Sequence, residues 1–175
     1  MWTLERRKQG ELLVFVIMVV STVVLMLSTL TLQSFTSVTG YLHLMSELST
    51  STLLGSVVTG MLLGHWYLAA PTTSITPLMW LTKVFGTAVL IRLTLSAVGL
   101  YLAWGQMVTL THWEWLGLRW LTGIIGPLVV FIMVWHILKY QNTQSATGVL
   151  YVGVILTFIG EMTASLLFRE LQQPL

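Results

Sequence analysis

The chain has 175 residues, of which 55% are hydrophobic and only 8% are charged. A water-soluble domain of this length carries far more charge on its surface, so the composition excludes an ordinary globular protein and indicates that lipid surrounds most side chains. A net charge of +2 without a basic cluster is not the footprint of a nucleic-acid-binding protein. The absence of cysteine excludes disulfides, iron–sulfur ligation and cysteine nucleophiles.

Several apolar stretches are long enough to cross a bilayer as helices. In hydrocarbon every backbone N–H and C=O must be paired inside the protein, and these stretches lack the alternation of transmembrane strands. The sequence therefore predicts an all-α polytopic bundle of about five spanning helices, in a single integral membrane domain over residues 1–175. In chain order, the expected helices cover about 11–32, 49–70, 80–104, 115–138 and 146–168.

The first stretch follows three basic residues at 6–8, a start that resembles a secretory signal. The stretch is longer than the ~7–15 apolar residues of a signal and lacks a small-x-small cleavage site, so we predict an uncleaved first helix. The segment 41–48 is either a short amphipathic helix in the membrane interface or an extension of the second span. Pro71 and Pro77 predict the turn between the second and third helices.

The distribution of Lys and Arg predicts a cytoplasmic N-terminus and an outer C-terminus, because cytoplasmic flanks carry more of these residues. Tryptophans near both ends of the expected helices form two aromatic belts that support the same boundaries. We expect a protein integral to a bacterial inner (plasma) membrane. The basic residues expected inside are Arg6, Arg7, Lys8, Lys83 and Lys139, and those expected outside are Arg119 and Arg169.

Two histidines, His65 and His136, lie at matching depth near the inner ends of the second and fourth expected helices. If these helices are neighbours, both imidazoles can face one cavity and supply the axial ligands of a b-type haem. Gly60 and Gly64 would let a porphyrin approach closely, or equally another helix through a GxxxG face. The alternative is a pair of interfacial histidines hydrated by water or headgroups. In these two positions the chain resembles membrane cytochrome b subunits.

Arg92 lies about 11 residues into the third expected span, near the bilayer midplane, where translocon scales assign a charge a cost of about 2.5–3.5 kcal/mol. Glu161 in the fifth span differs from it in depth by about 4 residues, or roughly 6 Å. We expect the two side chains to pair or to share a hydrogen-bonded cavity, with Arg119 as a candidate third member. Such a site suits a quinone headgroup, a haem propionate or a transferred proton; the alternative is an ion pair that fixes helix register.

The chain has no P-loop, H-E-x-x-H or G-x-S-x-G motif, so the sequence does not predict an enzyme that works on its own. The main hypothesis is an integral membrane subunit of an electron-transfer or quinone-interacting complex, with haem b between His65 and His136 as the candidate cofactor. One alternative is a non-catalytic accessory subunit. The other is a small transporter or channel, for which only Gly126-Pro127 suggests a broken helix. The expected partners are the lipid bilayer, other membrane subunits or a second copy, and quinone.

Overall fold

The computed structural model describes residues 15–17, 19–21, 23–24, 38–69, 74–103 and 110–171. The chain divides into two compact units, Met1–Leu44 and Met45–Leu175. In the first unit the described residues between 15 and 24 are helical, and the remainder of the expected first helix, 11–32, lies outside the described residues. The second unit is a helical bundle, and it carries all the side-chain contacts discussed below.

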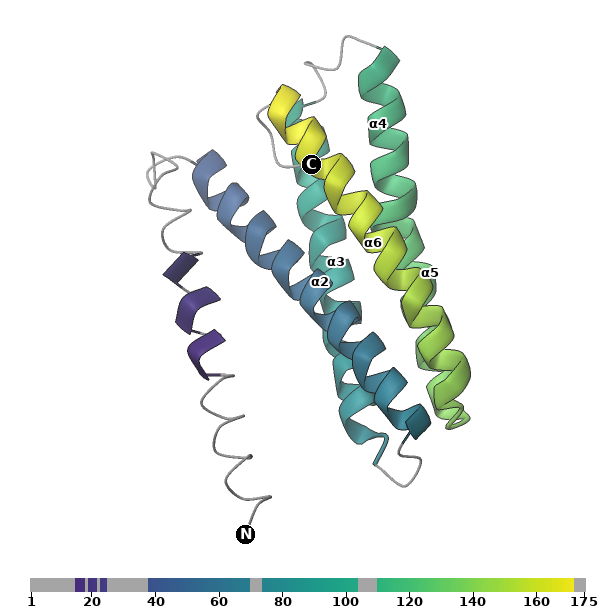
Figure 1. Cartoon of the computed structure of the whole chain (residues 1–175). Helices are drawn as coiled ribbons and strands as arrows, with labels where there is room; N and C mark the ends of the chain where they lie inside the picture. The colour runs from purple at the N-terminus through teal and green to yellow at the C-terminus, as the bar shows by residue number, and fades with distance from the viewer. Residues whose placement is uncertain are drawn as a thin grey trace. The chain divides into compact units, whose positions relative to one another are not determined.

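Every element of the described residues is a helix, which confirms the all-α class (Figure 1). The elements are α2 (Val38–Ala69), α3 (Thr76–Ala103), α4 (Leu110–Trp120), η2 (Leu121–Ile125), α5 (Gly126–Lys139) and α6 (Thr143–Leu171). Within the described residues four stretches are long and apolar enough to cross a membrane, namely Leu44–Ala69, Thr76–Tyr101, Trp113–Lys139 and Thr143–Arg169. They indicate a membrane-integral protein, and the fifth span stays a prediction.

The helix ends differ from the expected ones for local reasons. The segment 41–48 belongs to α2, so it extends the second helix. The helix α3 begins at Thr76, with Pro77 in its first turn. Backbone N–H groups in the first turn have no intrahelical acceptor, so proline, which lacks an N–H, costs no hydrogen bond there. Before α6, the side-chain oxygen of Asn142 accepts a hydrogen bond of 3.0 Å from the backbone N–H of Ser145 and caps the helix.

The expected fourth helix, 115–138, contains a π-helical turn. Pro127 has no N–H to donate to Gly123, and its ring would clash with that carbonyl in a regular α-helix. The chain widens here instead, and the N–H of Gly126 bonds to the carbonyl of Leu121. The wide turn buries three consecutive residues, 122–124. The interruption at Gly126-Pro127 is therefore a widened turn within one continuous rod formed by α4, η2 and α5.

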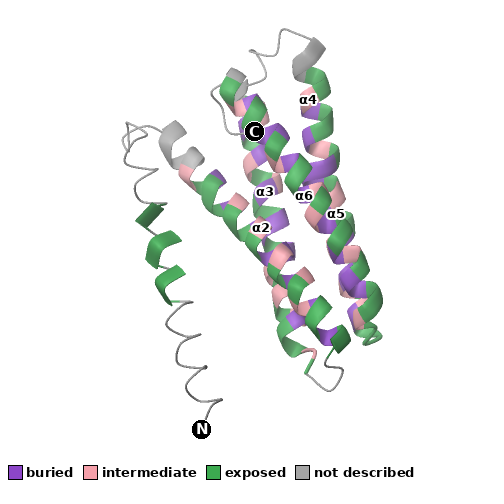
Figure 2. Ribbon diagram, in the orientation of Figure 1, coloured by how far each residue is buried: buried purple, intermediate pink, exposed green. Residues whose placement is uncertain are grey.

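The apolar core of the bundle is supplied by α2, α3, α5 and α6. Its buried members are at most 4% exposed and include Leu53, Val57, Phe85, Val89, Val130, Val134 and Leu150. The outer faces of the same helices carry exposed large apolar side chains, as expected for a surface in contact with lipid (Figure 2). Tryptophans of the expected aromatic belts are among them, with Trp66 62% exposed and Trp80 64% exposed.

The GxxxG face of α2 packs against α6. A Cβ atom at Gly60 would contact Leu150, and one at Gly64 would collide with the side chain of Thr147. Gly60 and Gly64 thus permit a close approach of α2 and α6, which is the helix-packing role expected for a GxxxG face. These glycines are not available to a porphyrin while α6 covers them.

Candidate functional site

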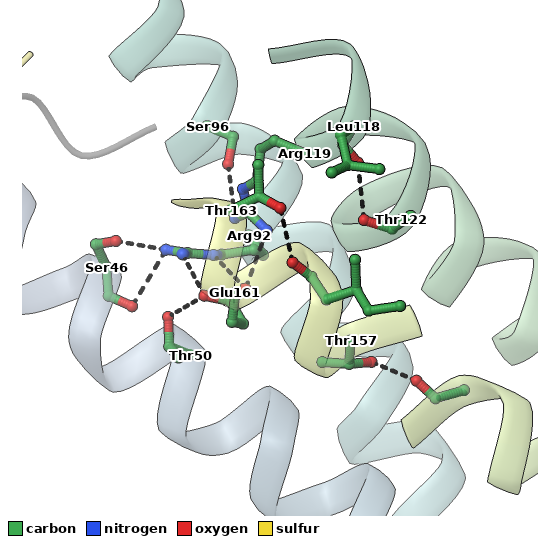
Figure 3. A network of polar contacts seen from close by, with 12 residues as sticks. Ser46, Thr50, Arg92, Ser96, Leu118, Arg119, Thr122, Thr157, Glu161 and Thr163 are labelled. Carbon is green, nitrogen blue, oxygen red and sulfur yellow. Dashed lines mark hydrogen bonds and ion pairs between the residues drawn. The ribbon is translucent and has the colours of Figure 1, made fainter. Parts of the chain in front are cut away.

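A buried cluster of three charged side chains joins α3, α4 and α6 (Figure 3). Arg92 of α3 and Arg119 of α4 both form ion pairs with Glu161 of α6. The side chains of these residues are 4%, 0% and 9% exposed, respectively. All three lie within helices that are apolar enough to cross a membrane, where unpaired charges are strongly disfavoured.

The carboxylate of Glu161 accepts four hydrogen bonds, two on each oxygen. Its Oε1 accepts from Arg92 Nε and Arg119 Nη1, both at 3.1 Å. Its Oε2 accepts from Arg92 Nη2 at 2.6 Å and from the hydroxyl of Thr50 at 2.9 Å. A carboxylate offers about four lone-pair positions, so these partners fill its acceptor capacity. Arg92 binds both oxygens side-on, the geometry in which a guanidinium–carboxylate pair is strongest.

Hydroxyl groups of α2 and α3 complete the cluster. Nη1 of Arg92 donates to the hydroxyl of Ser46 and, at 3.4 Å, to its carbonyl oxygen. Nη2 of Arg119 donates to the hydroxyl of Ser96 at 3.4 Å, which is longer than the usual 2.7–3.2 Å. Four helices therefore meet at one carboxylate, and the two longest hydrogen bonds around it, both 3.4 Å, are those from Arg119 to the Ser96 hydroxyl and from Arg92 to the Ser46 carbonyl.

The backbone crossing of η2 and α6 brings Arg119 to the carboxylate. A Cβ atom at Gly160 would collide with the backbone of Gly123, and a Cβ at Gly123 would collide with the guanidinium of Arg119. Only glycine at both positions allows the helices to approach this closely. Because Gly160 directly precedes Glu161, the crossing fixes the height at which the carboxylate meets Arg119.

A shallow, open apolar pocket of about 270 Å³ lies between α3 and α4. It is lined by Leu100, Trp113, Leu116, Gly117 and Trp120. Leu100 follows Ser96 by about one turn, while Leu116 and Trp120 flank Arg119 along α4. The pocket thus lies on the same two helices as the contact between Arg119 and Ser96, and it offers the aromatic rings of Trp113 and Trp120 to a flat guest.

Comparison with protein-family models, curated proteins and solved structures finds no match to this chain. What the site does has to be argued from its geometry.

The side chains that the sequence analysis paired, Arg92 and Glu161, lie in direct contact, and Arg119 joins them. The sequence analysis did not single out Ser46, Thr50 or Ser96 as members of the cluster. A signal for the first two was present, since residues 46–52 at the start of α2 are almost all polar within an otherwise apolar helix. Nothing comparable marks Ser96 among the apolar residues of α3.

The two histidines proposed as haem ligands are both exposed. His65 lies in the last turns of α2 and His136 in the last turn of α5, where its ring meets the ring of Tyr140 edge-on at 5.4 Å. The α6 helix covers the glycines beside His65, as described above. Within the described residues no group of three or more His, Cys, Asp or Glu side chains could hold a metal ion. Ligation of a haem by His65 and His136 stays a prediction.

Proposed function

We propose that the chain is an integral membrane subunit of an electron-transfer complex and that it interacts with quinone at the Arg92–Arg119–Glu161 cluster. The observation that carries the proposal is the cluster itself, in which two guanidinium groups share one carboxylate inside helices long and apolar enough to span a membrane. From the distribution of Lys and Arg, we assign the N-terminus to the cytoplasm and the C-terminus to the outside. The membrane proposed is a bacterial inner (plasma) membrane.

Helix packing alone does not require such a cluster. Buried ionic triads can often be replaced by well-packed apolar residues without loss of stability, because the cost of desolvating the charges offsets their attraction. In a bilayer each charge carries an additional insertion cost of about 2.5–3.5 kcal/mol. Intramembrane ionisable residues that face the interior of a bundle are accordingly interpreted first as functional.

Quinone chemistry suits the donors of the cluster. A quinone has two carbonyl oxygens that accept hydrogen bonds, and these oxygens gain negative charge when the ring is reduced. A guanidinium held in place in a buried site stabilises such developing charge. The contact between Arg119 and Ser96 is long at 3.4 Å, so a carbonyl oxygen at this place would be a better acceptor than the serine hydroxyl. Glu161 would hold Arg119 in position.

The pocket between α3 and α4 supports the same assignment. Its lining residues are apolar, and Trp113 and Trp120 among them can stack on a quinone ring. Small-molecule sites are lined mostly by apolar and aromatic side chains, and here Arg119 and Ser96 lie within about one turn of lining residues on the same helices. An isoprenoid tail can leave such a site directly into the lipid.

The electrons would come from a redox group of the same complex, and a b-type haem on His65 and His136 is the candidate. Because both side chains are exposed, a haem between them would lie on the outside of the bundle and be completed by another subunit or a second copy. A reduced-minus-oxidised spectrum of the complex should then show a haem α-band that disappears in both His65→Ala and His136→Ala. Colourless protein after haem supplementation removes haem from the proposal.

Quinone binding is tested with the full chain in lipid nanodiscs, titrated with a short-chain ubiquinone and a short-chain menaquinone. Quinones quench tryptophan fluorescence, and two tryptophans line the pocket. Arg119→Gln should raise the Kd about 10-fold through the loss of one charge-assisted hydrogen bond. Gly117→Leu should abolish saturable quenching by filling the pocket, because a Cβ at Gly117 meets nothing within 4 Å and the cluster stays intact.

The matched control is Gly55→Leu, since Gly55 is also exposed and free of neighbours within 4 Å of a Cβ atom. Saturable quenching in wild type that survives Gly55→Leu and is lost in Gly117→Leu supports the proposal. Absence of saturable quenching in wild type with both quinones, or equal binding by the two variants, overturns it. The fully occupied carboxylate of Glu161 would then favour the second candidate, an accessory subunit in which the cluster clamps four helices together.

A further inference from the structure

The buried hydroxyl groups of the bundle fall into two classes. In the larger class each hydroxyl donates to a backbone carbonyl of its own helix three or four residues earlier, which satisfies it without any other partner. This class contains Ser56, Thr82, Thr122, Thr147, Thr157 and Thr163. In the smaller class the hydroxyl instead forms a hydrogen bond with a charged side chain of the cluster, as in Ser46, Thr50 and Ser96.

Ser49 belongs to neither class. Its side chain is only 5% exposed, and its hydroxyl is the one buried side-chain N or O atom of the described residues that has no hydrogen-bond partner. It follows Ser46 by about one turn of α2 and precedes Thr50, so it lies on the face that α2 turns toward the cluster. Its neighbours Ser51 and Thr52 bond to carbonyls of their own helix at 2.9 and 2.8 Å. Hydroxyls of this helix can therefore bond to its own backbone carbonyls, yet the Ser49 hydroxyl makes no such bond.

The first turns of the Leu44–Ala69 span in α2 are also the most polar part of the four candidate spans. Residues 46–52 read Ser-Glu-Leu-Ser-Thr-Ser-Thr, and the span that contains them is the least hydrophobic of the four. Glu47 is exposed at this end of the bundle. Ser46 and Thr50, on either side of Ser49, reach Arg92 and Glu161 directly (Figure 3). A row of hydroxyls, those of Ser46, Ser49 and Thr50, thus leads along the first turns of the Leu44–Ala69 span to the buried charges.

We propose that an ordered water molecule binds the hydroxyl of Ser49 and that this row of hydroxyls admits water from the membrane surface to the Arg92–Glu161 pair. Water suits the position because it both donates and accepts, and buried waters bind where protein polar groups are otherwise unsatisfied. The bundle then has one hydrated seam, along the first turns of the α2 span, and a dry apolar core deeper in the membrane. The inference does not depend on quinone binding, although a hydrated cluster would supply the protons that quinone reduction consumes.

Cysteine labelling tests the seam cleanly, because the chain has no cysteine of its own. In nanodiscs, which expose both membrane surfaces, a small charged methanethiosulfonate reacts only with a thiol that water reaches. Ser49→Cys should react at least 10-fold faster than the matched control Ser56→Cys. Ser56 is equally buried at 6% exposure and lies two turns deeper on α2, but its hydroxyl bonds to Leu53 O at 3.0 Å. Any smaller difference between the two rates overturns the proposal.

A second measurement uses the unmodified protein. Water-edited solid-state NMR with ¹³C-labelled serine should show rapid transfer of polarisation from water to Ser49 and slow transfer to Ser56. The control is Ser51, which is exposed on α2. The rate of polarisation transfer from water to Ser51 shows whether this part of the helix lies in bulk water. Rapid transfer to Ser51 with slow transfer to Ser49 contradicts an internal water site.

Discussion

The substitution Glu161→Gln probes the cluster most directly, because glutamine has nearly the same shape but no charge. Its single carbonyl oxygen can replace only one carboxylate oxygen, so two of the four hydrogen bonds to Glu161 are lost. When the Oε1 position is lost, both lost donors are guanidinium groups, each worth about 1.5–3 kcal/mol. We therefore expect a fall of about 3–5 kcal/mol in the free energy of unfolding, the range for breaking a buried ion pair.

Reversible unfolding in mixed micelles, followed by tryptophan fluorescence, measures this change. The control is Glu114→Gln, which removes the same charge at an exposed position and is expected to change stability by no more than about 0.5 kcal/mol. Equal stabilities of the two variants would refute the assignment of Glu161 as the shared partner of both arginines. Solvent screens these charges little, since none of the three side chains is more than 9% exposed.

Two further substitutions test how the cluster is held. Gly160→Ala places a methyl group against the backbone of Gly123 and is expected to lower the free energy of unfolding by about 1–3 kcal/mol. The control is Gly148→Ala, which adds the methyl group in open space. It should leave the free energy of unfolding unchanged or raise it by up to about 1 kcal/mol. The same unfolding series compares them, and equal effects would contradict the close crossing. Arg119→Lys keeps the charge but loses the planar fork that joins Glu161 to α3, so stability should fall by about 1–2 kcal/mol; an unchanged value would speak against the assigned contacts.

The sequence by itself determined the helical, apolar character of the chain and the spacing of its charges along the helices. Long apolar runs can only be helices in lipid, since no water is present to satisfy an open backbone. Depth along a spanning helix follows from residue number at ~1.5 Å per residue, so Arg92 and Glu161 were expected within reach of each other. The ion pair between Arg92 and Glu161 agrees with this expectation.

Tertiary structure decided which way each side chain faces and which helices are neighbours. His65 and His136 share a depth, but helix rotation leaves both exposed rather than buried in the bundle. The contributions of Ser46, Thr50 and Ser96 depend on which helix surfaces meet, and hydropathy does not encode this because lipid and a neighbouring helix are equally apolar. The close passage of Gly123 and Gly160, with the wide turn before Pro127, placed Arg119 in the site. Depth is a one-dimensional property of the chain, whereas rotation and neighbour choice emerge only when the helices pack.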